Sequence, residues 1–441
     1  MKVLKFGGTS VGSAKQIKEV AKLINNGDKC IVVLSAMAGT TNTLVDIADY
    51  LFKKNPEGAN EIINQLEKSY HHHLEELLST AEYKQKGAEL IEHHFNLIRS
   101  FTKDIFTVYE ERIILAQGEL MSTGLMTYYL LENGVKAELL PALEFIRTDK
   151  NAEPDLAYIK EKLLQLLETT PEADIYITQG YICRNAYGEY DNLQRGGSDY
   201  TASLIGAAIE AQEIQIWTDI DGLHNNDPRF VANTQPIRQL NFDEAAELSY
   251  FGATILHPTC IQPAKYANIP VRLLNTMEPE AKGTLISNVS ERDRIKAVAG
   301  KDKITAIQIK SSRMLLAYGF LRKVFEIFET YQTPIDMVCT SEVGVSITID
   351  NTTKLAEILS ELRKYGTVTV DQNMCIICVV GDLKWTNVGF EAIALDAMKE
   401  IPVRMISYGG SNHNISFLID NENKQRALNA LSDKLFNQKN N

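Results

Sequence analysis

The sequence lacks any apolar run that approaches the roughly 18 residues of a membrane span. Its start, MKVLKFGG, also lacks the long apolar core of a signal peptide. Cysteine is scarce: six cysteines scattered over 441 residues do not make a disulfide framework. These absences predict a cytoplasmic protein with no membrane partner.

Basic residues are fewer than acidic ones: the chain has 45 lysines and arginines and 57 aspartates and glutamates, which gives a net charge of -12. A nucleic acid or an anionic membrane would require a basic face, so the composition argues against both partners. Apolar residues make up 44% and charged residues 23%, as in an ordinary globular protein. The length favours about three domains.

Two common phosphate-binding motifs, G-x-x-x-x-G-K-[ST] and G-x-G-x-x-G, are missing as well. Instead, KFGGTS (5–10) joins a short apolar strand to a helical stretch that follows Ser13. Glycine lets the backbone approach a ligand, a helix start offers N–H groups, and Lys5 adds a full positive charge. The pattern favours an anion site, although a plain strand-to-helix turn would also explain two glycines.

Short β-branched runs alternate with helical stretches over the first ~290 residues. The predicted strands lie at 29–36, 137–142, 173–180, 213–219 and 269–275. They are apolar on successive residues, so they predict a largely parallel sheet with both faces covered by helices. The stretch between residues 57 and 113 is almost entirely helical, which predicts a helical insertion in this domain.

Polar, glycine-rich segments follow several of these strands, at 34–42, 178–182 and 217–230, and another glycine-rich stretch lies at 192–209. Gly196-Gly197-Ser198-Asp199 repeats the opening pattern, and Asp199 suits the first turn of a helix. In open α/β sheets, ligands bind at the carboxyl ends of the strands. These segments therefore favour a phosphate-bearing ligand with a nearby metal ion, with unrelated turns as the alternative.

The pattern changes beyond residue ~300, where two β-α-β-β-α-β units follow each other. Residues 334–350 align with 402–420, and Gly319-Phe320 aligns with Gly389-Phe390. Neither copy carries the glycine-rich phosphate pattern. The duplication therefore predicts a region that binds something other than nucleotide, or a partner chain.

Two other patterns suggest metal or redox chemistry at first sight. Cys375 and Cys378 have C-x-x-C spacing, but they lie in an apolar run that reads as a buried strand, where residues three apart face opposite sides. The histidines at 71–73 and 93–94 lie in polar helical stretches, which favour a solvated helix face. We therefore predict no metal site at either place.

Taken in order, the motifs resemble those of aspartate kinases over nearly the whole chain. They are KFGGTS (5–10), SAMAGTTN (35–42), QGELMS (117–122), ITQGYI (177–182), QRGGSDYTA (194–202), WTDIDG (217–222), NDPR (226–229) and FGATILHP (251–258). The resemblance implies an α/β amino-acid-kinase fold, with a mostly parallel central sheet between helices, followed by two ferredoxin-like ACT domains. It implies domain limits of 1–298, 299–373 and 374–441, with ATP and Mg²⁺ used to phosphorylate the side-chain carboxylate of L-aspartate.

The resemblance also assigns roles to residues. It makes Lys5 a catalytic contact of the transferring phosphoryl group and Asp199 an acidic catalytic residue of unfixed role. The residues that it assigns to aspartate are Ser35, Thr41, Glu119, Arg195, Gly196, Gly197 and Ser198. Among them, Glu119 would pair with the ammonium group and Arg195 with the α-carboxylate. The residues that it assigns to ATP are Lys5, Phe6, Gly7, Gly8, Thr218, Asp219, His224, Arg229 and Thr254.

Two positions depart from the pattern of the family. Thr254 stands where many relatives have lysine, and His224 where a tyrosine often packs near the nucleotide. Loss of a lysine would weaken ATP binding. The alternatives are a related amino-acid kinase and a catalytically impaired amino-acid sensor that keeps its ACT domains.

The segments 311–321 and 334–344 resemble the lysine-binding segments of lysine-sensitive members. The match would place an effector against Met314, Gly319, Phe320, Leu321, Ile335, Asp336, Thr340, Ser341 and Glu342. Asp336 or Glu342 can pair with an ammonium group, with solvated turn residues as the alternative. Ala317-Tyr318 departs from the small polar pair expected there, which leaves lysine and threonine open as effectors. Paired ACT domains imply feedback inhibition and a homodimer or a dimer of dimers.

Overall fold

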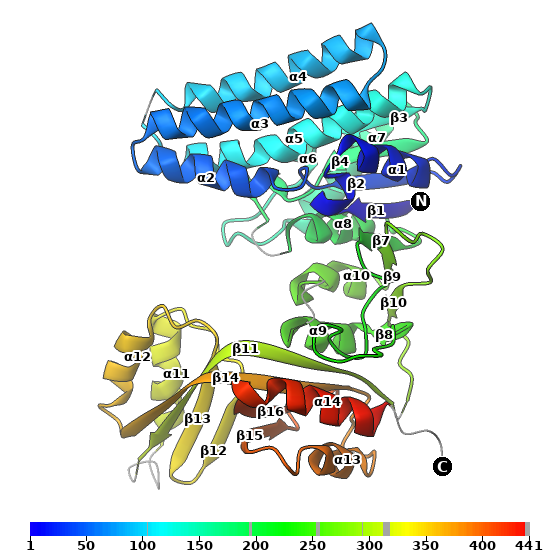
Figure 1. Cartoon of the computed structure of the whole chain (residues 1–441). Helices are drawn as coiled ribbons and strands as arrows, with labels where there is room; N and C mark the ends of the chain where they lie inside the picture. The colour runs from blue at the N-terminus through cyan, green and yellow to red at the C-terminus, as the bar shows by residue number, and fades with distance from the viewer. Residues whose placement is uncertain (104, 194–195, 253–255, 293, 312–317, 437–441) are drawn as a thin grey trace. The chain divides into compact units, whose positions relative to one another are not determined.

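The computed structural model describes the chain except for residues 104, 194–195, 253–255, 293, 312–317 and 437–441. The chain divides into two compact units (Figure 1). Unit 1 comprises Met1–Leu223 and Leu256–Asn288, and unit 2 comprises His224–Ile255 and Val289–Asn441. Among the described residues, the helices are all too short or too polar to cross a membrane.

Unit 1 is built on a mostly parallel sheet with the strand order β3-β4-β2-β1-β7-β9-β10. Its strands are β1 (Lys2–Phe6), β2 (Cys30–Leu34), β3 (Ala137–Leu140), β4 (Ile175–Gln179), β7 (Ile214–Thr218), β9 (Val271–Asn275) and the antiparallel β10 (Thr284–Ser287). Every residue of β2 and β4 is buried, as a sheet covered on both faces requires. The five predicted strands correspond to β2, β3, β4, β7 and β9, and a small hairpin joins β5 (Ile182–Arg184) to β6 (Tyr190–Asn192).

The helices of unit 1 form the rest of its framework. They are α1 (Ala14–Ile24), α2 (Thr40–Phe52), α3 (Pro56–Leu77), α4 (Ala81–Ser100), α5 (Val108–Glu132), α6 (Ala142–Phe145), α7 (Leu156–Thr169), α8 (Gly197–Ala208) and α10 (Gln262–Tyr266), with short 3₁₀ turns η1 (Gly8–Val11) and η2 (Pro258–Ile261). Helices α2 to α5 pack in succession against one another (Figure 1). A capping box between Thr107 and Glu110 starts α5.

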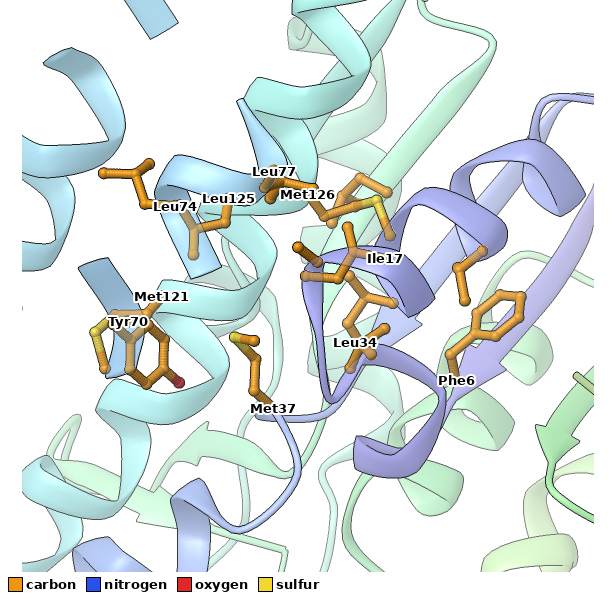
Figure 2. Close-up of a cluster of buried hydrophobic side chains, with 14 of the residues drawn as sticks. Phe6, Ile17, Leu34, Met37, Tyr70, Leu74, Leu77, Met121, Leu125 and Met126 are labelled. Atoms are coloured by element: carbon orange, nitrogen blue, oxygen red, sulfur yellow. The ribbon is translucent and has the colours of Figure 1, made fainter. Parts of the chain in front are cut away.

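The core of unit 1 joins the sheet to these helices. Figure 2 shows Phe6 and Leu34 of the strands with Ile17 of α1, and Tyr70 and Met121 of α3 and α5 in the same cluster. The Tyr70 hydroxyl lies 3.1 Å from the Thr40 hydroxyl, so this buried phenol is paired. Burial raises the pKa of Tyr70, which keeps the hydroxyl neutral.

One histidine of the predicted solvated face is buried. His94 is 9% exposed because α4 packs against α5, and its Nδ1 lies 2.6 Å from Gln117 Oε1. Burial lowers the pKa of His94 and favours the neutral ring. The prediction of a solvated face is therefore wrong for His94, whereas His71, His72 and His93 are exposed. Among the described residues, no group of three or more metal-binding side chains is found.

Unit 2 contains one antiparallel six-stranded sheet, in the order β12-β13-β11-β14-β16-β15. The strands of this sheet are β11 (Ile295–Lys310), β12 (Val338–Ser341), β13 (Gly344–Ile349), β14 (Thr367–Gly381), β15 (Val403–Tyr408) and β16 (Asn414–Asp420). The short β8 (Gln239–Asn241), earlier in the chain, does not belong to this sheet. The helices of unit 2 are α9 (Phe242–Tyr250), α11 (Phe320–Thr330), α12 (Leu355–Leu362), α13 (Phe390–Ala397) and α14 (Lys424–Leu435). Gly319 and Gly389 both adopt the left-handed conformation before α11 and α13, as their aligned positions in the duplication suggest.

The two repeats share their central strands. The segments predicted as separate strands around 367–371 and 375–382 form one strand, β14. The first half of β11 pairs with the second half of β14, from Ile295 opposite Gly381 to Lys301 opposite Ile376. The second half of β11 pairs with the first half of β14. The predicted limits at 298/299 and 373/374 thus fall inside β11 and β14. Cys375 and Cys378 are buried free thiols on β14.

Candidate active site

Four neighbouring strands of unit 1 end at the same edge of the sheet. Phe6 pairs with both Leu34 and Trp217, and Leu34 pairs with Gln179. The residues that follow these strand positions at the carboxyl edge are Gly7, Ser35, Gly180 and Thr218. This edge is where open α/β sheets bind ligands.

Lys5 of β1 forms an ion pair with Asp199 of α8. The Lys5 Nζ lies 2.7 Å from Asp199 Oδ1, and the two side chains are only 13% and 14% exposed. A Cβ on Gly7 would lie 3.5 Å from that Nζ, so the ammonium group rests against the glycine backbone. A Cβ on Gly8 would lie 2.9 Å from Ala36 O, which leaves room only for glycine. The predicted catalytic pair therefore meets beside the Gly-Gly backbone.

Helix α8 begins without a side-chain cap, on Gly196 in the left-handed conformation. A Cβ on Gly196 would overlap Cys260 Sγ at 1.7 Å, and Gly197 also has a positive φ of 41°. This tight start places Ser198 and Asp199 in the first helical turn. Arg195, directly before it, lies outside the described residues.

Hydroxyl groups connect the ends of β2 and α8. The Ser35 Oγ donates to Ser198 Oγ at 2.9 Å. Ser122 of α5 donates to the Ser35 carbonyl oxygen at 2.9 Å, a contact that sequence reasoning missed although Ser122 closes the QGELMS motif. Thr41 is half-buried in the first turn of α2, the helix that follows Ser35 in the sequence. The structure thus brings the predicted Ser35 and Ser198 into direct contact.

Glu119 lies in the interior of α5 with 3% of its surface exposed. Its Oε1 accepts the Ala36 N–H at 3.3 Å, whereas its Oε2 is buried and has no hydrogen-bond partner among the described residues. Burial raises the pKa of Glu119 to about 8, since the charged form is poorly solvated there. A buried carboxylate with an open oxygen is suited to receive a cationic group from a ligand.

Glycine explains how Glu119 reaches this position. A Cβ on Gly118 would lie 2.7 Å from the Ala36 Cβ, so only a glycine lets α5 approach the end of β2 this closely. The approach is what brings the Glu119 carboxylate to the Ala36 N–H. The sequence offers no separate signal for this contact.

The residues predicted for ATP fall in both units. In unit 1, the Phe6 ring stacks on Trp217 with centroids 5.6 Å apart, and the Thr218 hydroxyl donates to Asp219 Oδ1 at 3.1 Å. In unit 2, His224 Nδ1 lies 2.9 Å from Thr234 Oγ1. Arg229, also in unit 2, pairs with Asp227 at 2.6 Å. Thr254 lies outside the described residues. The ATP assignments for all these residues stay predictions.

The residues predicted for an effector lie in unit 2. Gly319 has a φ of 83° at the start of α11, Phe320 is buried and Leu321 is 38% exposed. The other predicted positions are Ile335, half-buried, and Thr340, Ser341 and Glu342, exposed at the end of β12 and in the turn after it. Met314 lies outside the described residues.

Asp336 is already engaged within unit 2. Its carboxylate forms an ion pair with Lys301 at 2.6 Å and accepts a hydrogen bond from the Tyr250 hydroxyl at 2.8 Å. Only 1% of its side chain is exposed, and none of the residues that the structure describes forms a hydrogen bond with Oδ2. Burial raises the pKa of Asp336, an effect that Lys301 opposes. An effector ammonium would thus compete with Lys301.

Comparison with known proteins identifies the family. The amino acid kinase family matches residues 1–275, and an ACT domain matches residues 377–435. Aspartokinase 3, chloroplastic, of Arabidopsis thaliana is 35% identical over 98% of this chain and 81% of its own length. The chain belongs to the aspartokinase family.

Relatives in the aspartokinase family include enzymes of bacteria as well as plants. Lysine-sensitive aspartokinase 3 of Escherichia coli is 34% identical over 98% of this chain and 99% of its own length. The crystal structure of Escherichia coli aspartokinase III with aspartate and ADP (R-state) matches with a TM-score of 0.85 at 33% identity, covering 99% of this chain and 100% of that one. Its complex with lysine and aspartate (T-state) matches with a TM-score of 0.81 at 34% identity, covering 99% of each chain. The fold is therefore an amino-acid-kinase fold followed by ACT domains, as the sequence predicts.

Proposed function

We propose that the chain is an aspartate kinase that transfers the γ-phosphoryl group of ATP to the side-chain carboxylate of L-aspartate. The product, 4-phospho-L-aspartate, is the first intermediate towards lysine, threonine and methionine. The observation that carries the proposal is the edge of the unit 1 sheet, where Lys5 lies against a Gly-Gly backbone near a buried carboxylate with an open oxygen. The lysine and the glycines suit phosphate, and the carboxylate suits an α-ammonium group.

The acceptor needs no general base, because the side-chain carboxylate of aspartate is ionised at neutral pH. The transfer then depends on positioning and on neutralising the charge of the phosphoryl group. Lys5 supplies that charge, and Asp199 holds its ammonium group in place. Glu119 Oε2 would accept from the substrate ammonium, with the Ser35 and Ser198 hydroxyls as neighbours. Arg195 suits the α-carboxylate because a guanidinium group can bind it through two hydrogen bonds.

Magnesium fits the acidic residues of this edge. Mg²⁺ usually keeps several waters and binds through one or two carboxylates together with substrate phosphates. Asp199 and Asp219 supply carboxylates of that kind on α8 and directly after β7. When bound with ATP, the ion would neutralise part of the phosphate charge, while Lys5 and the backbone of Gly7 and Gly8 would orient the γ-phosphoryl group.

A coupled ADP-release assay with a panel of amino acids tests the proposal. We expect turnover with L-aspartate, confirmed by hydroxylamine trapping of the acyl phosphate as a hydroxamate. Glutamate should be a poor substrate, because its extra methylene carries the carboxylate past the γ-phosphate. Equal turnover with glutamate, or none with aspartate, would contradict the proposal.

We further propose that an amino acid, lysine first among the candidates, inhibits the chain through unit 2 and that two chains pair there. The lysine complex of the Escherichia coli relative supports lysine. Inhibition requires that the effector bind an inactive state more tightly than the active one. Separate titrations with lysine, threonine and methionine at subsaturating aspartate, with light scattering for the mass, test both parts. Inhibition by threonine alone would overturn the choice of lysine, and a monomer at assay concentration would overturn the pairing.

A further inference from the structure

Tyr181, the residue that follows Gly180 at the end of β4, has an unusual backbone conformation. Its φ of 67° lies in the left-handed region, which a bulky residue rarely adopts. Such conformations cost of order 1–3 kcal/mol and persist only where the surrounding contacts enforce them. Among the described residues, the hydrogen bonds of its N–H and carbonyl oxygen lead to α8 and to the segment before it.

The backbone of Tyr181 is tied to two segments that flank the start of α8. Its N–H donates to Thr201 Oγ1 at 3.0 Å, and its carbonyl oxygen accepts the Leu193 N–H at 2.8 Å. The Thr201 hydroxyl in turn donates to the Gly197 carbonyl oxygen at 3.3 Å. Tyr181 therefore connects the end of β4 to the chain before α8 and to its first turn.

The ring of Tyr181 also packs against the first turn of α8, at Gly197. A Cβ on Gly197 would lie 3.2 Å from Tyr181 Cδ2, and a Cβ on Gly180 would lie 2.4 Å from Ser198 Cβ. The end of β4 and the first turn of α8 are thus packed without spare room. Burial raises the pKa of Tyr181 to about 12, with further contributions from Glu119 and Asp191, so the hydroxyl stays neutral.

The first turn of α8 carries two residues of the proposed site. Ser198 meets Ser35 of the β2 edge, and Asp199 pairs with Lys5 of β1. Their positions depend on where the helix begins, because the turn has no side-chain cap of its own. A change of the β4–α8 contact would therefore move both side chains together.

We propose that Tyr181 is a positioning residue for the phosphoryl transfer, whose left-handed backbone and ring fix Ser198 and Asp199 against Ser35 and Lys5. The inference rests on the proposed function, since it assigns a role in that reaction. Tyr181 has no assigned contact with the phosphoryl group or with Lys5, and it acts on the reaction through α8.

The test removes the backbone tie and the ring separately. Thr201→Val keeps the shape of the side chain but removes the acceptor of the Tyr181 N–H and the donor to Gly197. We expect kcat to fall about 10- to 100-fold, because small misplacements at a reacting centre lower the rate by factors of this size. The KM for ATP should change by less than about twofold. Amide hydrogen exchange at Ser198 and Asp199 should become faster. Ser203→Ala is the matched control, because it removes a buried hydroxyl of α8 for which the described chain offers no hydrogen-bond partner.

The ring is tested by Tyr181→Leu, which should lower kcat, and by Tyr181→Phe, which should retain it within about twofold because packing needs no hydroxyl. The proposal is overturned if folded Tyr181→Leu keeps wild-type kcat and KM, or if Tyr181→Phe loses as much as Tyr181→Leu. Should Thr201→Val not fold, the Tyr181 pair still decides. Wild-type protein is assayed in parallel: if it does not turn over aspartate, the proposed function fails, and the exchange rates at Ser198 and Asp199 alone then judge the positioning role.

Discussion

The burial of Glu119 disfavours the ionised form of its side chain. The folded state raises its pKa to about 8 from an ordinary value of 4.5, so the folded chain binds this proton more tightly than the unfolded chain does. The free energy of unfolding should therefore fall as pH rises from about 4.5 to about 8. Within the described part of the chain Oε2 has no partner, a local cost that a ligand ammonium would relieve.

Glu119→Gln should separate this cost from the function. Glutamine keeps an oxygen for the Ala36 N–H but cannot ionise, so the variant should unfold at a higher temperature than wild type. The difference should be small near pH 5 and should grow towards pH 8, where the wild-type carboxylate ionises. Calorimetry of the unliganded proteins across this range measures it, and aspartate-dependent ADP release should be lost. A difference in Tm that shrinks with rising pH would contradict the argument.

Lys5→Ala should remove the charge that faces the phosphoryl group. We expect kcat to fall about 10²–10³-fold, the usual cost of one such stabilising contact. Lys2→Ala is the matched control, because Lys2 lies on the same strand but pairs with the exposed Asp28. Near-wild-type turnover in a folded Lys5→Ala protein would remove Lys5 from the site.

At the scale of elements, the closeness of α5 to the end of β2 decides where Glu119 lies. Gly118→Ala would bring a methyl group within 2.7 Å of the Ala36 Cβ, and neither atom can rotate away. The helix must then shift, so we expect KM for aspartate to rise about tenfold or more. Steady-state kinetics with aspartate as the varied substrate measures this.

Gly124→Ala is the control on the same helix. The atoms nearest to its Cβ would belong to the end of the Leu90 side chain, the closest at 2.5 Å, and this side chain can change rotamer. Alanine also favours helix over glycine by about 1 kcal/mol. This variant should therefore keep wild-type KM, and an equal rise of KM in both variants would show that α5 does not act through the Ala36 contact.

In unit 2, Lys301 connects α9 to the first repeat, since its ammonium group also lies 4.2 Å from the centroid of the Tyr250 ring. Lys301→Met should free the Asp336 carboxylate for an effector ammonium, so that less lysine is needed for half-inhibition. Lys303→Met, an exposed neighbour on the same strand, should leave the inhibition curve unchanged. Weaker inhibition in Lys301→Met than in the control would contradict competition for Asp336.

At the scale of the whole molecule, the sequence predicts the features that local patterns encode. The apolar runs predict the strands β2, β3, β4, β7 and β9 of unit 1, and the repeated order of elements predicts the duplication, because both depend on neighbours along the chain. The resemblance to aspartate kinases also brings Lys5, Asp199, Ser35 and Ser198 together in one prediction, and the structure gives them direct contacts.

Other features depend on partners that are distant in the sequence. His94 is buried because α5 covers it, and the single strand β14 exists because β11 pairs along both of its halves. The positive φ of Tyr181 is enforced by Thr201 and Leu193, so no local propensity marks it. Sequence patterns alone could not specify these contacts.

The shared sheet of unit 2 also sets an order of events during synthesis. The first half of β11 leaves the ribosome long before its partner, because Ile295 pairs with Gly381 and Lys301 with Ile376. Until then one strand edge has no native partner, and such an edge can pair with the wrong chain. Nascent chains that stall between these two strands should therefore be the ones that depend on chaperones, whereas chains that have passed β14 can pair this edge of β11 with its native partner.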